Sequence, residues 1–70
     1  MSNKHDMATA WLRCTPGERD RVIYTLREAE KQMETMKAEA IYGMPALRAE
    51  AARMIDVYNY AIRELTRRVN

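Results

Sequence analysis

The residues whose types could do chemistry are few in this chain, and none has the partners that such chemistry needs. His5 is the only histidine and lies in a polar N-terminal stretch, so no pair of histidines can hold a metal ion. Cys14 is the only cysteine, and no histidine or asparagine accompanies it as a plausible partner in nucleophilic catalysis. The chain has no glycine-rich phosphate loop. We therefore expect no catalytic, cofactor or metal site, and a protein that is not an enzyme.

Charged residues are abundant, but their pattern is typical of a solvent-exposed helix face. Glu30, Glu34 and Glu39 are interspersed with Lys31 and Lys37, and opposite charges recur three residues apart. Over the whole chain, 12 Lys and Arg residues oppose 10 Asp and Glu residues, which leaves a formal net charge of +2. This excess is too small to indicate a nucleic-acid partner by itself.

The length and composition favour one small helical domain. The chain has 70 residues with only two glycines and two prolines, and its single cysteine excludes an internal disulfide. No apolar run approaches the roughly 20 residues that a membrane span needs. The N-terminal stretch lacks the apolar segment of a secretory signal. We expect a soluble, cytoplasmic protein with no contact to a membrane.

A turn signal in the middle of the chain divides it into two long segments. Gly43 can adopt the left-handed conformation that ends a helix. Pro45 suits the first position of a new helix and disfavours a helical conformation at Met44. We therefore expect the chain to reverse its direction at this point.

Apolar residues on both sides of this turn recur at alternating steps of four and three, which is the heptad pattern of packed helices. Before the turn they are Val22, Leu26, Ala29, Met33, Met36 and Ala40. After the turn they are Leu47, Ala51, Met54, Tyr58, Ala61 and Leu65. Folding the chain about Gly43 sets a small residue against a large one in most layers, as close packing requires. The sequence therefore predicts an all-α fold, built on an antiparallel helical hairpin.

Capping signals set the expected boundaries. Thr15, Pro16 and Glu18 match a capping box, with Thr15 as N-cap and Pro16 as the first helical residue. We predict a loose tail over residues 1–6, a short helix over 7–14, and long helices over 16–42 and 45–69, all in one domain. The short helix cannot be stable alone, so Trp11 and Leu12 are expected to anchor it to the hairpin.

Further apolar residues lie beside the predicted contact between the long helices. Val57 falls at a g position, and the e positions hold Ile23, Ile55, Ile62 and Val69. Burying each would stabilise the fold by roughly 1.5–3 kcal/mol, yet one hairpin cannot bury them all. The N-terminal segment is expected to cover part of this surface. We expect a second copy to cover the rest, so that the e residues form the interface of a homodimer with a helical-bundle fold.

The two ends of the predicted hairpin differ in chemistry. One end collects arginines from several segments, and Arg63, Arg67 and Arg68 are the most concentrated of them. The simpler interpretation is that these three complement the negative end of a helix dipole. The alternative is that this end binds nucleic acid or an acidic protein face.

The opposite end is unusually apolar for a turn. Ile41, Tyr42 and Met44 lie there, and Arg48 follows one helical turn later. Tyrosine and methionine are enriched in the cores of protein interfaces. We predict that these four residues bind a partner protein. The alternative is that Ile41 and Met44 simply close the end of the bundle.

One family resemblance rests on Trp11 followed by Thr15-Pro16-Gly17-Glu18-Arg19, on the long helical segments rich in Ala, Met and Arg, and on the Arg-rich end. In these features the chain resembles small early proteins of Pseudomonas-type temperate phages, and within them it is most similar to quorum-sensing anti-activators. The resemblance implies a dimeric helical protein in the host cytoplasm. It further implies inhibition of a LuxR-type transcription regulator and of the type IV pilus assembly ATPase by direct contact. The alternative function is a small dimeric nucleic-acid-binding regulator that uses the Arg-rich end.

Overall fold

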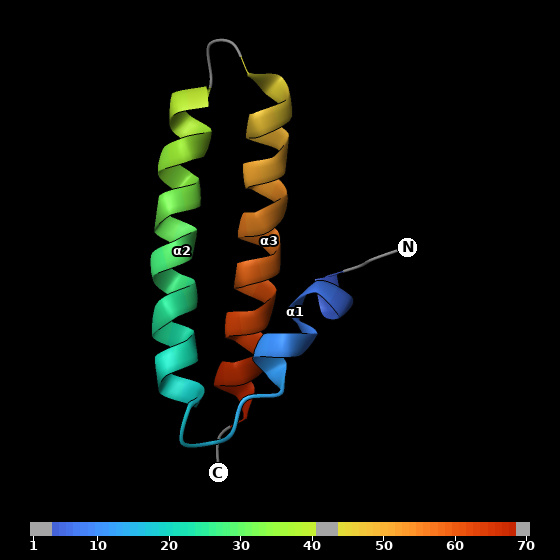
Figure 1. Cartoon of the computed structure of the whole chain (residues 1–70), viewed down its shortest axis with the longest axis vertical. Coiled ribbons are helices and arrows are strands. Elements are labelled where there is room, and N and C mark those ends of the chain that lie inside the picture. Colours follow the sequence, from blue (N-terminus) through green and yellow to red (C-terminus); the bar gives the residue numbers. More distant parts are fainter. Residues whose placement is uncertain (1–3, 41–43, 69–70) are drawn as a thin grey trace.

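The computed structural model describes residues 4–40 and 44–68, and within them every regular element is helical. The elements are α1 (Lys4–Leu12), α2 (Arg19–Glu39) and α3 (Pro45–Arg67). The prediction of an all-α fold is confirmed. The long helices α2 and α3 lie side by side and run in opposite directions, and α1 packs against the C-terminal half of α3 (Figure 1). The expected turn residues 41–43 lie outside the described residues.

Helix α1 begins earlier than the sequence predicts. Residues 4–6 were expected in a loose tail, but the helix starts at Lys4 and ends at Leu12. Docking explains the extension, because the Nδ1 atom of His5 lies 2.9 Å from the hydroxyl of Tyr60 on α3 and shares a hydrogen bond with it. The hydroxyl of Thr9 also donates to the carbonyl of His5, at 2.9 Å. A polar contact to α3 therefore holds the first turn in place.

Helix α2 begins later than predicted. It starts at Arg19 with Glu18 as N-cap, rather than at Pro16 with Thr15 as N-cap. Residues 15–18 instead form a turn in which the amide of Glu18 donates to the carbonyl of Thr15, at 2.9 Å. The Glu18 carboxylate accepts hydrogen bonds from both the amide and the hydroxyl of Thr15, each at 3.0 Å. Only the glutamate half of the predicted capping box forms, because the Thr15 hydroxyl points to Glu18 rather than to a helical amide.

The other ends of the long helices differ less from expectation. Helix α2 ends at Glu39, before the predicted end at residue 42. Helix α3 begins with Pro45 in its first turn, as predicted, and ends at Arg67 instead of residue 69. Proline is suited to this first position because its fixed φ is helical and its missing amide hydrogen has no helical acceptor there.

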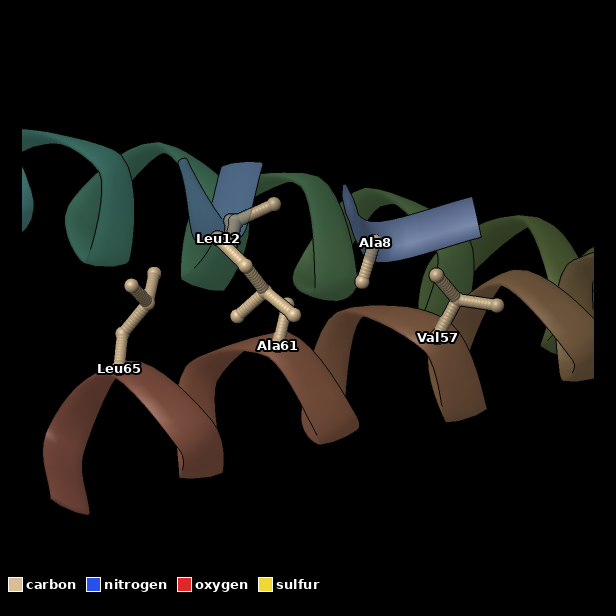
Figure 2. Packing of buried hydrophobic residues seen from close by; sticks show 6 residues of the cluster. Ala8, Leu12, Val57, Ala61 and Leu65 are labelled. Carbon is tan, nitrogen blue, oxygen red and sulfur yellow. The ribbon is translucent and has the colours of Figure 1, made fainter. Parts of the chain in front are cut away.

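The largest apolar cluster draws on all three helices. Its buried members are Ala8, Leu12, Leu26, Val57, Ala61 and Leu65. Figure 2 shows Leu12 beside Ala61 and Ala8 close to Val57, so α1 lays its buried residues along α3. The ring of Trp11 packs against that of Tyr58 with 5.6 Å between their centroids, and both Trp11 and Leu12 lie against the cluster. Val57, which an isolated pair of long helices would leave uncovered, is fully buried.

This cluster occupies only one half of the α2–α3 pair, which we call the basal half. Helix α1 has nine residues and α3 has 23, so their lengths are about 13 Å and about 34 Å at 1.5 Å per residue. The half nearest residues 41–43, which we call the distal half, receives no cover from α1 (Figure 1). There, small residues such as Ala40 and Ala51 are buried, while larger neighbours remain open to solvent.

Candidate protein-binding surface

Three large apolar side chains are exposed in the distal half. Met36 at the end of α2 is 36% exposed, Leu47 at the start of α3 is 37% exposed, and Met44, just before α3, is 59% exposed. We call these residues the distal apolar patch. Met36 and Leu47 belong to the heptad stripe and would be buried if a third element lay over them. In the basal half α1 supplies that cover, and in the distal half no described residue does.

Two of the four predicted partner-binding residues fall at this patch. Met44 is part of it, and Arg48 is exposed one turn into α3. Arg48 lines a shallow hollow together with Lys37, Ala49 and Ala52, so basic side chains border small apolar ones. The other two predicted residues, Ile41 and Tyr42, lie outside the described residues.

Sequence reasoning did not find Met36 and Leu47. The heptad pattern places both in the contact between the long helices, where burial is expected. The available signal was the length of the N-terminal helix, because a short helix can cover only part of a much longer one. Comparing the length of the short N-terminal helix with the lengths of the two heptad patterns would have predicted that the distal half is uncovered.

The predicted dimer-interface residues are partly covered within a single chain. Ile55 is only 8% exposed in the single chain, so its burial does not depend on a second copy, and its place in a dimer interface stays a prediction. Ile23 and Ile62 are half-buried and pack against the basal cluster. Val69 lies outside the described residues.

Most of the arginines near the C-terminal end of α3 form hydrogen bonds or ion pairs within the chain. Arg19 donates through Nη1 to the carbonyl of Arg68, and Arg68 donates through Nη1 to the carbonyl of Leu12. Arg67 forms an ion pair with Glu64 at 2.8 Å. These contacts join the C-terminal end of α3 to the segments that flank residues 13–18. Arg63 is exposed, and no carboxylate in the described part of the chain lies within ion-pair distance of it.

The titratable groups form no reactive arrangement within residues 4–40 and 44–68. No group of three or more His, Cys, Asp or Glu side chains there could hold a metal ion. Cys14 is a free thiol of intermediate exposure. The hydrogen bonds from the Thr15 amide and hydroxyl, in that order, together with the charge of Arg21, lower the pKa of Glu18 below its usual value of 4.5. That shift has a structural origin in the turn that precedes α2.

Comparison with known protein families, with characterised proteins and with solved structures finds no match to this chain. Among the helices of the described residues, none is both long enough and apolar enough to cross a membrane.

Proposed function

We propose that this protein is a small, non-enzymatic inhibitor or adaptor that binds another protein by direct contact. The observation that carries the proposal is the distal apolar patch, where Met36, Met44 and Leu47 are exposed at one end of a helix pair. Methionine suits such a role because its unbranched, polarisable side chain adapts to irregular surfaces. Lys37 directly follows Met36 on α2 and Arg48 directly follows Leu47 on α3, so basic residues adjoin the patch in sequence, as suits the polar rim that protein interfaces commonly have.

The proposal includes self-association. The two long helices would form a helical hairpin, and two copies would pack into a helical bundle. Ile23 and Ile62 support this step, because both remain half-exposed beside the α2–α3 contact after α1 has docked. A chain of about 70 residues commonly needs such additional burial to be stable. The distal apolar patch includes neither isoleucine, so self-association leaves it free for another protein.

The family resemblance suggests who the partner is. A phage-encoded anti-activator would occlude a LuxR-type regulator of its bacterial host and, through the same or another surface, the type IV pilus assembly ATPase. Binding at an exposed helix end fits this kind of inhibition, since occlusion needs affinity and bulk but no catalytic group.

The test is a titration of a purified LuxR-type regulator bound to its promoter DNA. The protein should release the regulator from the DNA, and Leu47→Glu or Met44→Glu should weaken this inhibition by roughly 30-fold, as for a hot-spot residue. Tyr24→Glu is the matched control, because Tyr24 is 67% exposed but lies on the basal half of α2. Equal inhibition by all variants would reject the distal patch. No inhibition by the wild type would reject this class of target.

A second candidate function is binding of nucleic acid at the basal end. It is favoured by exposed arginines that form no ion pair with a carboxylate in residues 4–40 or 44–68, namely Arg13, Arg21, Arg27 and Arg63. Phosphate contacts would make affinity fall steeply with salt, with a log–log slope of about −0.9 for each phosphate neutralised on B-form DNA. A capture experiment with and without nuclease, followed by salt titration of the wild type and Arg63→Gln, separates this candidate from protein binding.

A further inference from the structure

The side of the α2–α3 pair that α1 leaves uncovered carries two parallel stripes of residues, which we call the open face. On α2 the stripe contains Ile23, Arg27, Glu30, Glu34 and Lys37. On α3 it contains Ala52, Ile55, Asn59, Ile62 and Thr66. Residues three and four apart share one side of a helix, so each stripe is continuous.

Surface hollows show that the two stripes belong to the same face. Ile23 and Arg27 of α2 line one hollow together with Thr66 of α3. Farther along, Lys37 of α2 lines another together with Ala52 of α3. Between these, Asn59 and Ile62 line a third. The members of the α1 contact, Val57 and Ala61, fall on the other side of α3.

The middle of the open face is small or apolar. Of the aliphatic residues in the two stripes, Ile55 is buried, and Ile23, Ile62 and Ala52 are partly exposed. The α3 side of this face therefore offers apolar contact to a partner helix pair, beside the charged side chains of the α2 stripe. Such burial of half-exposed aliphatic side chains is a source of association energy, at about 25 cal/mol for each Å² of apolar surface removed from water.

The charges along the α2 stripe determine which orientation of a second copy is favourable. Arg27 and Glu34 are both exposed and lie two helical turns apart. If two copies of α2 cross with opposite directions about a point between Glu30 and Lys31, Arg27 of each copy faces the partner's Glu34, and two opposite-charge pairs form. The two copies of Glu30 meet in this arrangement and in the same-direction one, so Glu30 does not decide between them. If the copies run in the same direction, Arg27 faces the partner's Arg27 and like charges repel. The crossing point lies near the middle of α2, which spans Arg19–Glu39, so the antiparallel arrangement also gives nearly full overlap.

We propose that the open face binds a second copy of this chain in antiparallel orientation, in register so that Arg27 and Glu34 pair reciprocally. This inference rests on the self-association included in the proposed function, and it adds the face, the direction and the register. An antiparallel dimer places its two distal apolar patches at opposite ends, so one dimer holds two partner proteins.

The test uses complementary charge reversal, read by sedimentation equilibrium and native mass spectrometry. Arg27→Glu alone puts two carboxylates together at each contact, and Glu34→Arg alone puts two guanidinium groups together. Each homodimer should weaken by about ten-fold or more, since each has two like-charge contacts in place of two attractive ones. An equimolar mixture of the two variants should form a heterodimer in strong preference to either homodimer, because opposite charges then meet across the interface again.

The matched control is Arg21→Glu with Glu28→Arg, a pair with the same spacing that lies outside the open face. These variants, alone or mixed, should self-associate as the wild type does, and thermal melts should show all variants folded. A dimeric wild type whose single variants self-associate as tightly as it does would overturn the antiparallel register, because copies that run in the same direction have like charges facing at both positions before and after either reversal; self-association would then still stand. A wild type that stays monomeric at about 100 μM would overturn both the register and self-association. Its free energy of dimerisation would then be less favourable than about −5.5 kcal/mol. Neither outcome bears on binding of a regulator by the distal patch, which the promoter titration tests separately.

Discussion

At the scale of single residues, equivalent positions in the heptad pattern have different environments. Leu65 and Met36 occupy the same kind of position, yet Leu65 is fully buried and Met36 is 36% exposed. The difference arises because Leu65 packs in the basal cluster, where three helices meet, whereas Met36 lies where only two helices run. The pattern alone assigns both residues to the same contact.

This contrast predicts unequal costs of truncation. We expect Leu65→Ala to lower the free energy of unfolding by about 2–5 kcal/mol, because it removes a fully packed side chain and leaves a cavity. Met36→Ala should cost less than about 1 kcal/mol, because solvent already reaches that side chain. Urea denaturation of both variants measures the two values. Equal losses would mean that the distal half is covered in solution, for example by a second copy.

A second residue-scale prediction concerns Glu18. Its carboxylate accepts hydrogen bonds from the Thr15 amide and hydroxyl, which hold its pKa below 4.5 in the folded chain. Because the folded pKa is the lower one, the stabilisation is present above the unfolded pKa and is lost as the pH falls through the folded pKa. Glu18→Gln should therefore show a smaller loss of stability on acidification than the wild type.

The measurement is the urea midpoint at several pH values from about 7 to about 3, a range that spans the usual pKa of glutamate. Glu39→Gln is the control, since Glu39 is an exposed glutamate near the other end of α2. The urea midpoint of Glu39→Gln should fall with pH as that of the wild type does. If Glu18→Gln and Glu39→Gln behave alike, the turn before α2 does not hold the carboxylate in solution.

At the scale of elements, α1 decides how much of the long helices is buried. It is too short to be stable alone, and it becomes helical by packing Ala8 and Leu12 against α3. In the same cluster Val57 and Ala61 of α3 are fully buried. The pairing of Trp11 with Tyr58 and the hydrogen bond between His5 and Tyr60 hold it at two further points.

Docking of α1 can be tested with two alanines of the same helix. Ala8 is fully buried and Ala10 is exposed, so Ala8→Glu should displace α1 while Ala10→Glu should not. We expect Ala8→Glu to lower Tm by about 8 °C or more, as a loss of one to two kcal/mol does in a small domain. Emission of Trp11, the only tryptophan, should shift to the red in Ala8→Glu alone. Identical melts for the two variants would contradict the docked position.

At the scale of the whole molecule, the small net charge conceals an uneven distribution. Arginines gather in the basal half, whereas Glu30, Glu34 and Glu39, interspersed with Lys31 and Lys37, lie along the second half of α2. The total of +2 says nothing of this separation. An antiparallel pair of copies would bring the basic region of each toward the acidic region of the other.

This distribution predicts a salt effect on self-association. Raising NaCl from about 0.05 M to about 0.5 M should weaken the dimer a few-fold, because exposed ion pairs are screened while apolar contacts are not. The double variant Arg27→Gln with Glu34→Gln should show a flatter dependence, since it lacks both charged groups. Sedimentation equilibrium at several salt concentrations measures both. A dimer that strengthens with salt would point to an interface held by apolar contacts alone.

Much of this architecture could be predicted from the sequence, because the signals concerned are local. Heptad spacing indicated two long helices, Pro45 marked the start of α3, and Trp11 and Leu12 were correctly expected to lie against the rest of the chain. Each of these features depends on residues within a few turns of one another. Met44 and Arg48 could be assigned to a candidate site for the same reason, since they follow a turn signal directly.

Tertiary structure alone decided which apolar residues are covered. The spacing of apolar residues shows which side of a helix is apolar. Whether a given residue on that side is buried depends on whether another element packs over it at that point along the helix. Helix α1 reaches only the basal half, so Val57 is buried while Met36 and Leu47 are exposed. Ile55 is also buried within the single chain, although its heptad position lies beside the contact between the long helices. The candidate site therefore arises from the unequal lengths of the helices, which no local pattern records.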